Sequence, residues 1–202
     1  GKLEGFQSIS TNTTTNKYCQ KQNSKNDPNN ICTLCYSWTM LKTFRQNMAP
    51  SLQRNSDLLT SKILHPDALP VINQAFFRFN AHGELDLDKK KATINLINYI
   101  NIAIKNPHCN FALWTKRFDI VKPYFDKNKK PKNFILVYSN PKINHIFKKP
   151  PTHFDKTFNN VYENIEVKKQ NCTGQKCKDC LLCYKLDTTN TIVEKVKSYG
   201  KK

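Results

Sequence analysis

The sequence predicts an α/β protein, either a partial (β/α) barrel or an open parallel sheet, with irregular Cys-rich segments at both ends of the chain. Continuous apolar strands alternate with helical patterns through the middle of the chain, which is typical of parallel pairing with both faces covered. A length of 202 residues falls short of the about 250 typical of a full eight-stranded barrel. No apolar run approaches the roughly 20 residues of a membrane span.

The individual elements follow from hydrophobic periodicity and from turn residues. Strands are expected at 6–10, 75–79, 110–114 and 133–138, with one more within 154–162. Helices are expected within 33–47, after Pro50, at 91–105, at 120–126 and at 191–198. The polar stretch 11–31 is expected to form a loop around Cys19. Core positions are expected at Leu52, Leu58, Leu59, Trp38 and Phe44.

We expect a single domain over residues 1–202. It comprises an N-terminal strand, Cys loop and helix (1–47), an α/β core (48–165) and a Cys-rich C-terminal segment (166–202). The start of the chain shows no basic-then-apolar signal peptide.

The charge of the chain is strongly positive, with 33 Lys and Arg against 15 Asp and Glu, or +18. Such a charge favours polyanions, either nucleic acid or an anionic membrane surface, and scattered lysines that serve solubility are the alternative. Local lysine runs occur at 89–91, 127–132, 148–149 and 201–202. We expect no membrane partner, and the sequence does not indicate an oligomeric state.

Eight cysteines dominate the candidate chemistry. They are Cys19, Cys32, Cys35, Cys109, Cys172, Cys177, Cys180 and Cys183. Thiols two residues apart converge on one point, so the spacing favours metal binding over four disulfides. Metal binding by thiolates indicates a reducing compartment, hence the cytoplasm. Cys109 stands alone and is expected to be a small buried side chain.

Cys19, Cys32 and Cys35 suit three irons of a 4Fe–4S cluster whose fourth iron stays open for a small chelating ligand. Radical S-adenosylmethionine enzymes hold their cluster in this way, and these three residues resemble the expanded-loop variants of that pattern. The resemblance implies that Glu84, in the turn Gly83-Glu84 after an apolar strand, receives the amino group of S-adenosylmethionine. The alternative for Glu84 is a carboxylate that stabilises the start of the next helix.

The second cysteine set, Cys172, Cys177, Cys180 and Cys183, has the spacing Cys-x4-Cys-x2-Cys-x2-Cys. It fits a second 4Fe–4S cluster, and a structural zinc ion held by four thiolates is the alternative. A third arrangement combines Cys32 and Cys35 with two of the C-terminal cysteines in one shared site.

Ligands of parallel α/β sheets bind at the carboxyl ends of the strands. Three expected turns lie there, and they contribute His82, Gly83, Glu84, Thr115, Lys116, Arg117 and Ser139 as candidate cofactor-binding residues. Lys116 and Arg117 are suited to a phosphate or carboxylate, although rim charges that face water are equally compatible with the sequence.

The order of these motifs resembles the phage-type gene product 88 family and its bacterial relatives. The features shared are Cys32-x2-Cys35-Tyr36, Arg78-Phe79 leading to Gly83-Glu84, Trp114-Thr115-Lys116-Arg117 and the multi-cysteine tail. The resemblance implies a radical-SAM-like barrel with cysteine-ligated clusters, located in the host cytoplasm if the gene is phage-encoded. The expected function is an iron–sulfur protein, a small radical-SAM-like enzyme acting on an anionic or nucleic-acid substrate. The alternatives are a non-catalytic zinc or iron–sulfur nucleic-acid-binding protein, and an electron carrier.

Overall fold

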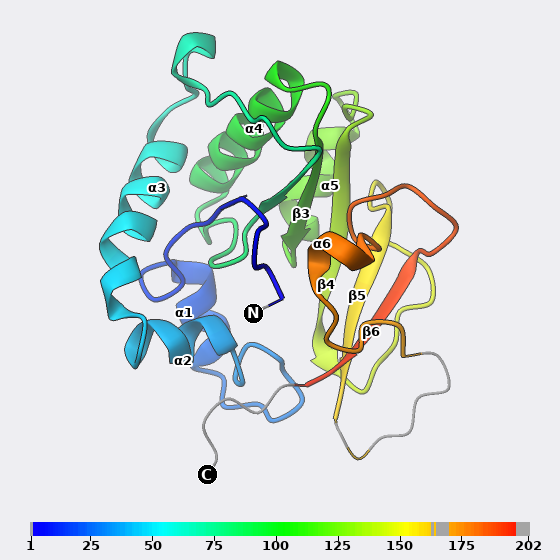
Figure 1. Cartoon of the computed structure of the whole chain (residues 1–202). Coiled ribbons are helices and arrows are strands. Elements are labelled where there is room, and N and C mark those ends of the chain that lie inside the picture. Colours follow the sequence, from blue (N-terminus) through cyan, green and yellow to red (C-terminus); the bar gives the residue numbers. More distant parts are fainter. Residues whose placement is uncertain (1, 163, 165–169, 197–202) are drawn as a thin grey trace.

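The structure is a computed structural model, and it describes residues 2–162, 164 and 170–196. Its centre is a six-stranded sheet in which every neighbouring pair is parallel and the strand order follows the chain (Figure 1). The strands are β1 (Ser8–Ile9), β2 (Phe76–Phe79), β3 (Asn110–Thr115), β4 (Phe134–Ile143), β5 (Lys156–Val161) and β6 (Thr191–Lys195). The expected α/β class is confirmed, and the sheet is open.

Helices connect the first four strands. The α-helices are α1 (Lys17–Asn23), α2 (Tyr36–Lys42), α3 (Ala49–Ser61), α4 (Lys89–Lys105), α5 (Phe118–Phe125) and α6 (Cys177–Cys180). Two short 3-10 helices, η1 (Gln46–Met48) and η2 (Pro66–Ala68), flank α3. Right-handed crossovers between strands in sequential order place successive helices on the same side. Figure 1 shows α4 and α5 together behind the sheet. No helix in the described part of the chain has the length and apolarity to cross a bilayer.

The side of the sheet that faces α4 and α5, here called the helix face, carries the larger core. Strand residues alternate between faces, so one set of aromatic and aliphatic side chains points to the helices. The strand residues of this core are Phe77, Phe79, Phe111, Leu113, Phe134 and Leu136. Phe79 stacks between Tyr99 of α4 and Phe111, with ring centroids 4.2 and 5.2 Å away.

The opposite side of the sheet, here called the inner face, is covered by the Cys-rich C-terminal segment. Its strand residues Ala112, Trp114, Ile135 and Val137 pack against Tyr184, together with Leu181, Cys177 and Cys183. The short helix α6 lies in front of β4 in Figure 1, on the side away from α4 and α5. The inner face therefore has a small core of its own.

The loop after β1 passes directly over the turn after β2. Thr11 N–H donates to the His82 carbonyl at 3.1 Å, and Gly83 N–H donates to Thr13 Oγ1 at 2.8 Å. Gly83 has a φ of +82°, and a Cβ there would lie 2.0 Å from Thr11 Oγ1. The close approach of the two loops thus depends on the absence of a side chain at this position.

Two expected elements are wrong. Residues 17–23 form helix α1 where a loop was expected, because Asn16 caps the first turn and the polar side chains lie on its surface. Residues 191–195 form strand β6 where a helix was expected. Thr191, Ile192 and Val193 are β-branched, and pairing with β5 selects the extended backbone.

Some expected side-chain positions and one boundary also differ. Leu58 and Phe44 are 53% and 66% exposed, whereas Leu52 and Leu59 are buried as expected. Strand β4 does not end at the expected turn at Ser139 but continues to Ile143, with a break in its register against β5. The part of the expected C-terminal helix at 197–198 lies outside the described residues.

Replacing Gly83 by Ala is expected to lower the free energy of unfolding by roughly 2–4 kcal/mol, because the positive φ and the contact with Thr11 are both unfavourable. Urea unfolding followed by circular dichroism measures the change. Gly5→Ala is the control, since Gly5 also has a positive φ but its Cβ would meet no atom closer than 3.8 Å. Equal losses for the two variants would contradict the role of the close contact.

Candidate metal centres

The N-terminal thiol group consists of Cys19, Cys32 and Cys35. Cys19 lies in the first turn of α1, where its N–H donates to Asn16 Oδ1 at 3.0 Å. Cys32 lies in the following loop, and its N–H donates to Asn30 Oδ1 at 3.0 Å. Cys35 is the N-cap residue of α2. Side-chain caps and a helix start therefore fix the backbone at all three cysteines.

Glu84 is the residue that connects this segment with the end of β3. Its carboxylate accepts hydrogen bonds from Thr115 Oγ1 (2.5 Å), Lys116 N–H (2.8 Å) and Leu85 N–H (2.9 Å), while its carbonyl accepts from Asn16 Nδ2 (2.7 Å). The side chain is almost fully buried. The next helix, α4, is capped by Asp88. Glu84 therefore does not serve as the helix-start carboxylate that the sequence suggested as an alternative role.

Lys116 extends from the end of β3 on the inner face, and its Nζ donates to Ser139 Oγ at 3.1 Å. It forms no ion pair with any carboxylate among the residues that the structure describes. Burial alone lowers the pKa of Lys116, but the Cys32 thiol, together with Glu84, Tyr18 and Cys35, raises it overall. The Lys116 charge therefore favours the thiolate forms of Cys19 and Cys32.

Arg117 and His82 are already engaged within the fold. Arg117 is buried, and its guanidinium binds both carboxylate oxygens of Asp119 at 2.8 Å and the carbonyls of Leu85 and Asp86. His82 Nδ1 lies 2.7 Å from Ser37 Oγ. Burial, with the charges of Arg78 and Arg45, lowers the pKa of His82 to about 4. The imidazole is therefore neutral at pH 7.

The electrostatics at Cys19 and Cys32 favour neutral thiols in the metal-free protein. Burial raises the pKa of Cys19, and the charges of Glu84, Cys35 and Cys32 raise it further, whereas Lys116 lowers it. Burial likewise raises the pKa of Cys32, and Lys116 is the strongest opposing charge. Lys116 thus favours the thiolate forms of both Cys19 and Cys32, and Lys25 adds to its effect on Cys32.

The C-terminal thiol group consists of Cys172, Cys177, Cys180 and Cys183. Burial raises the pKa of Cys183 and that of Cys177, and in both cases Arg78 opposes the increase. The Arg78 guanidinium lies 4.0 Å from the ring centroid of Trp114 on the inner face, and its Nε is buried without a hydrogen-bond partner in the described chain. It pairs with no described carboxylate.

The N-terminus of the chain reaches this second group. Lys2 Nζ donates to Cys172 Sγ at 3.2 Å and also binds Glu194, and the Lys2 carbonyl accepts from Cys177 N–H at 2.8 Å. Gln175 Nε2 donates to Cys180 Sγ at 3.4 Å. The C-terminal thiol group therefore has one cationic and one amide donor directed at sulfur.

All eight cysteines are free thiols. Cys109 is fully buried within the helix-face core, as a small apolar residue would be. Among the described residues, no three His, Cys, Asp or Glu side chains converge on one point as a metal site requires. Metal binding at either thiol group would therefore need local movement of the cysteine-bearing loops.

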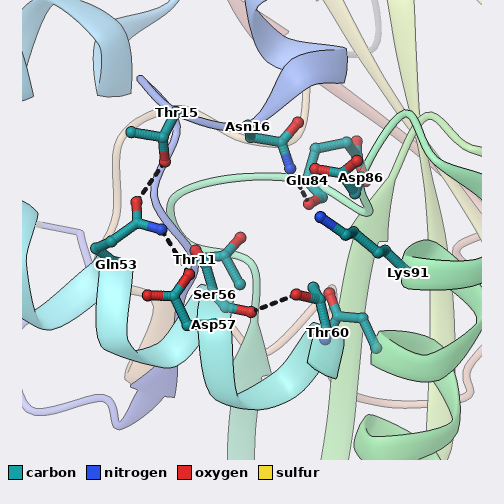
Figure 2. A pocket seen from close by; sticks show the side chains of 11 residues that line it. Thr11, Thr15, Asn16, Gln53, Ser56, Asp57, Thr60, Glu84, Asp86 and Lys91 are labelled. Atoms are coloured by element: carbon teal, nitrogen blue, oxygen red, sulfur yellow. Dashed lines mark hydrogen bonds between the residues drawn. The ribbon is translucent and has the colours of Figure 1, made fainter. Parts of the chain in front are cut away.

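A polar pocket of about 120 Å³ lies on the other side of Glu84, between α3 and α4. Figure 2 shows Glu84, Asp86 and Lys91 on one wall and Gln53, Ser56, Asp57 and Thr60 of α3 on another. No cysteine lines this pocket, so it is separate from both thiol groups.

Two residues, Asn16 and Arg78, were given no role at the site from the sequence, although Arg78 belongs to the motif that resembles the family. Asn16 has a recognisable signal, an Asn immediately before a helix, which the interpretation of 11–31 as a loop concealed. Arg78 is the one cation in the aromatic strand β2, where alternation places it opposite Phe77 and Phe79. The contacts of Arg78 on the inner face depend on where the C-terminal segment lies. No local sequence pattern predicts that position.

In the metal-free protein, Lys116→Met is expected to raise the pKa of Cys32 and to slow its alkylation by iodoacetamide at pH 8 several-fold, because removing the cation disfavours the thiolate. Mass spectrometry of the labelled peptides measures the rate at Cys32. Lys122→Met, a change far from any thiol that removes an ion pair with Asp126, serves as the control. An unchanged rate in Lys116→Met would show that the ammonium does not act on this thiol.

Comparison with known proteins identifies the family to which the chain belongs. No match was found among curated proteins or among solved structures. Residues 7–173, which include the N-terminal thiol group, Glu84, Lys116 and Cys172, match the family described as gene product 88. The chain belongs to the gene product 88 family.

Proposed function

We propose that the protein is an iron–sulfur protein with two thiolate-ligated centres and that it acts as a small radical-SAM-like enzyme. Cys19, Cys32 and Cys35 would hold a 4Fe–4S cluster, and the C-terminal thiol group would hold a second one. Three thiolates leave one iron of a cube without a protein ligand, and such an iron can bind a small chelating molecule such as S-adenosylmethionine.

The observation that carries this proposal is the pairing of each thiol group with one unpaired cation. Lys116 faces the N-terminal group and Arg78 faces the C-terminal group, and neither has a described carboxylate in salt-bridge contact. Partly desolvated cations without counter-ions are unfavourable. A thiolate-ligated centre carries negative charge, so ligation would supply a counter-charge for Arg78 and would add to the charge of Glu84 near Lys116.

The donor set also fits the chemistry of the cofactor. Sulfur ligands favour iron–sulfur clusters and zinc over hard cations. The raised pKa values of Cys19, Cys32, Cys177 and Cys183 mean that binding releases protons, so the affinity should fall as the pH is lowered. Glu84 stays the proposed partner of the amino group of S-adenosylmethionine. Its three existing donors assign it a positioning role as well.

Four thiols in the C-terminal group also fit a structural zinc ion. The specific feature that favours this alternative is the placement of the group on the inner face. There Cys177 and Cys183 pack against a small apolar core, and a closed site would hold the segment in place. In that case only the N-terminal group would contain iron.

Anaerobic purification with iron, sulfide and zinc assays tests the proposal. We expect about eight irons and eight sulfides per chain, or about four of each with one zinc, and an absorption band near 400 nm. Adding S-adenosylmethionine should change the paramagnetic resonance spectrum of the reduced N-terminal cluster. A colourless protein without iron would refute the proposal.

Cysteine variants assign the centres. The triple variant Cys19→Ala, Cys32→Ala, Cys35→Ala should lose one cluster and the response to S-adenosylmethionine, while the second metal stays. Cys109→Ala is the matched control, because Cys109 is buried in the core away from both thiol groups and should leave the metal content unchanged. Equal metal loss in the triple variant and the control would mean that unfolding, not ligand removal, explains the result.

A further inference from the structure

Two lysine-rich loops lie side by side at the end of the sheet opposite the N-terminal thiol group. One loop, residues 126–133, joins α5 to the start of β4. The other, residues 148–155, is the later part of the connection from β4 to the start of β5. Both loops therefore end at the amino-terminal end of a strand. Lys116 lies at the other end of the sheet, because it follows the carboxyl end of β3.

Polar side-chain contacts join the two loops and occupy their acidic side chains. Asp126 Oδ1 lies 2.8 Å from His153 Nε2, and Lys130 Nζ lies 2.5 Å from Asp155 Oδ2. Lys130 also donates to the His153 carbonyl. The carbonyl of Lys148 accepts a hydrogen bond from Thr191 Oγ1 at the start of β6, which fixes the backbone of the second loop there. The loops thus form one continuous, pinned surface.

The remaining cations of these loops are exposed and unpaired within the described chain. We call them the lysine edge: Lys127, Lys129, Lys132, Lys148 and Lys149. None of the exposed large apolar side chains belongs to these loops. A surface that inserts into a membrane combines cations with apolar side chains. The lysine edge has cations without exposed large apolar side chains, which favours a polyanion bound by electrostatic attraction alone.

We infer that the lysine edge binds the phosphate backbone of nucleic acid, without reading its sequence. The occupant follows from charge complementarity: five pinned lysines stand on a chain of net charge +18, and no exposed aromatic side chain lies beside them for base stacking. The six residues of β3 at about 3.3 Å each separate this edge from Lys116 by roughly 20 Å. The lysine edge is therefore a surface separate from the N-terminal thiol group.

Fluorescence anisotropy with a labelled 20-base-pair DNA duplex, at salt concentrations from 50 to 200 mM, tests the inference. The variant Lys129→Gln, Lys132→Gln, Lys148→Gln, Lys149→Gln should bind about tenfold or more weakly at 100 mM salt. The slope of log affinity against log salt should become shallower by about 3 to 4, since each lost phosphate contact contributes about 0.9.

A charge-matched control distinguishes binding at the lysine edge from attraction by the net positive charge of the whole protein. Lys17→Gln, Lys21→Gln, Lys89→Gln, Lys90→Gln removes four exposed lysines elsewhere and should keep its affinity within about twofold. Equal weakening of both variants, or no binding by the unchanged protein, would overturn the inference. It would also be overturned if phosphatidylserine vesicles, and not the duplex, lost affinity for the lysine-edge variant. Metal content should be the same in both variants.

Discussion

The candidate centre at the carboxyl end of the sheet depends on one buried carboxylate. Glu84 receives hydrogen bonds from the end of β3 through its side chain and from Asn16 through its carbonyl. Asn16 in turn caps the helix turn that carries Cys19. One residue therefore sets the relation between the β1 loop, the β2 turn and the β3 end. A buried carboxylate is tolerable here because three donors satisfy it.

Unpaired positive charge is the second organising feature. A protein with more than twice as many cations as anions cannot pair every lysine and arginine, and most remain in water. Lys116 and Arg78 differ because they are partly withdrawn from solvent, interact with cysteine sulfur and form no salt bridge among the described residues. Sulfur becomes an adequate counter-ion only when it is deprotonated, and ligation to metal maintains that state at neutral pH.

Much of the fold follows from local pattern. Buried strands such as 134–138 are apolar on both faces, and α4 has a clear helical period, so both were predicted correctly. The predictions for α1 and β6 were wrong because these segments are polar or short. Capping by Asn16 decides the conformation of α1, and pairing with β5 decides that of β6. Cysteine spacing is a local pattern, so it could predict metal binding. The roles of Lys116 and Arg78 depend on contacts between segments far apart in the sequence, so no local pattern could predict them.

The sequential order of the strands has a consequence for how the protein forms during synthesis. Each strand of the sheet pairs with the one made just before it, so the chain can add strands in order without waiting for a distant partner. The N-terminal thiol group, Glu84 and Lys116 are all present once β3 has joined. The C-terminal thiols and β6 arrive last and close over a surface that is already built. The N-terminal thiol group is therefore assembled before the C-terminal one.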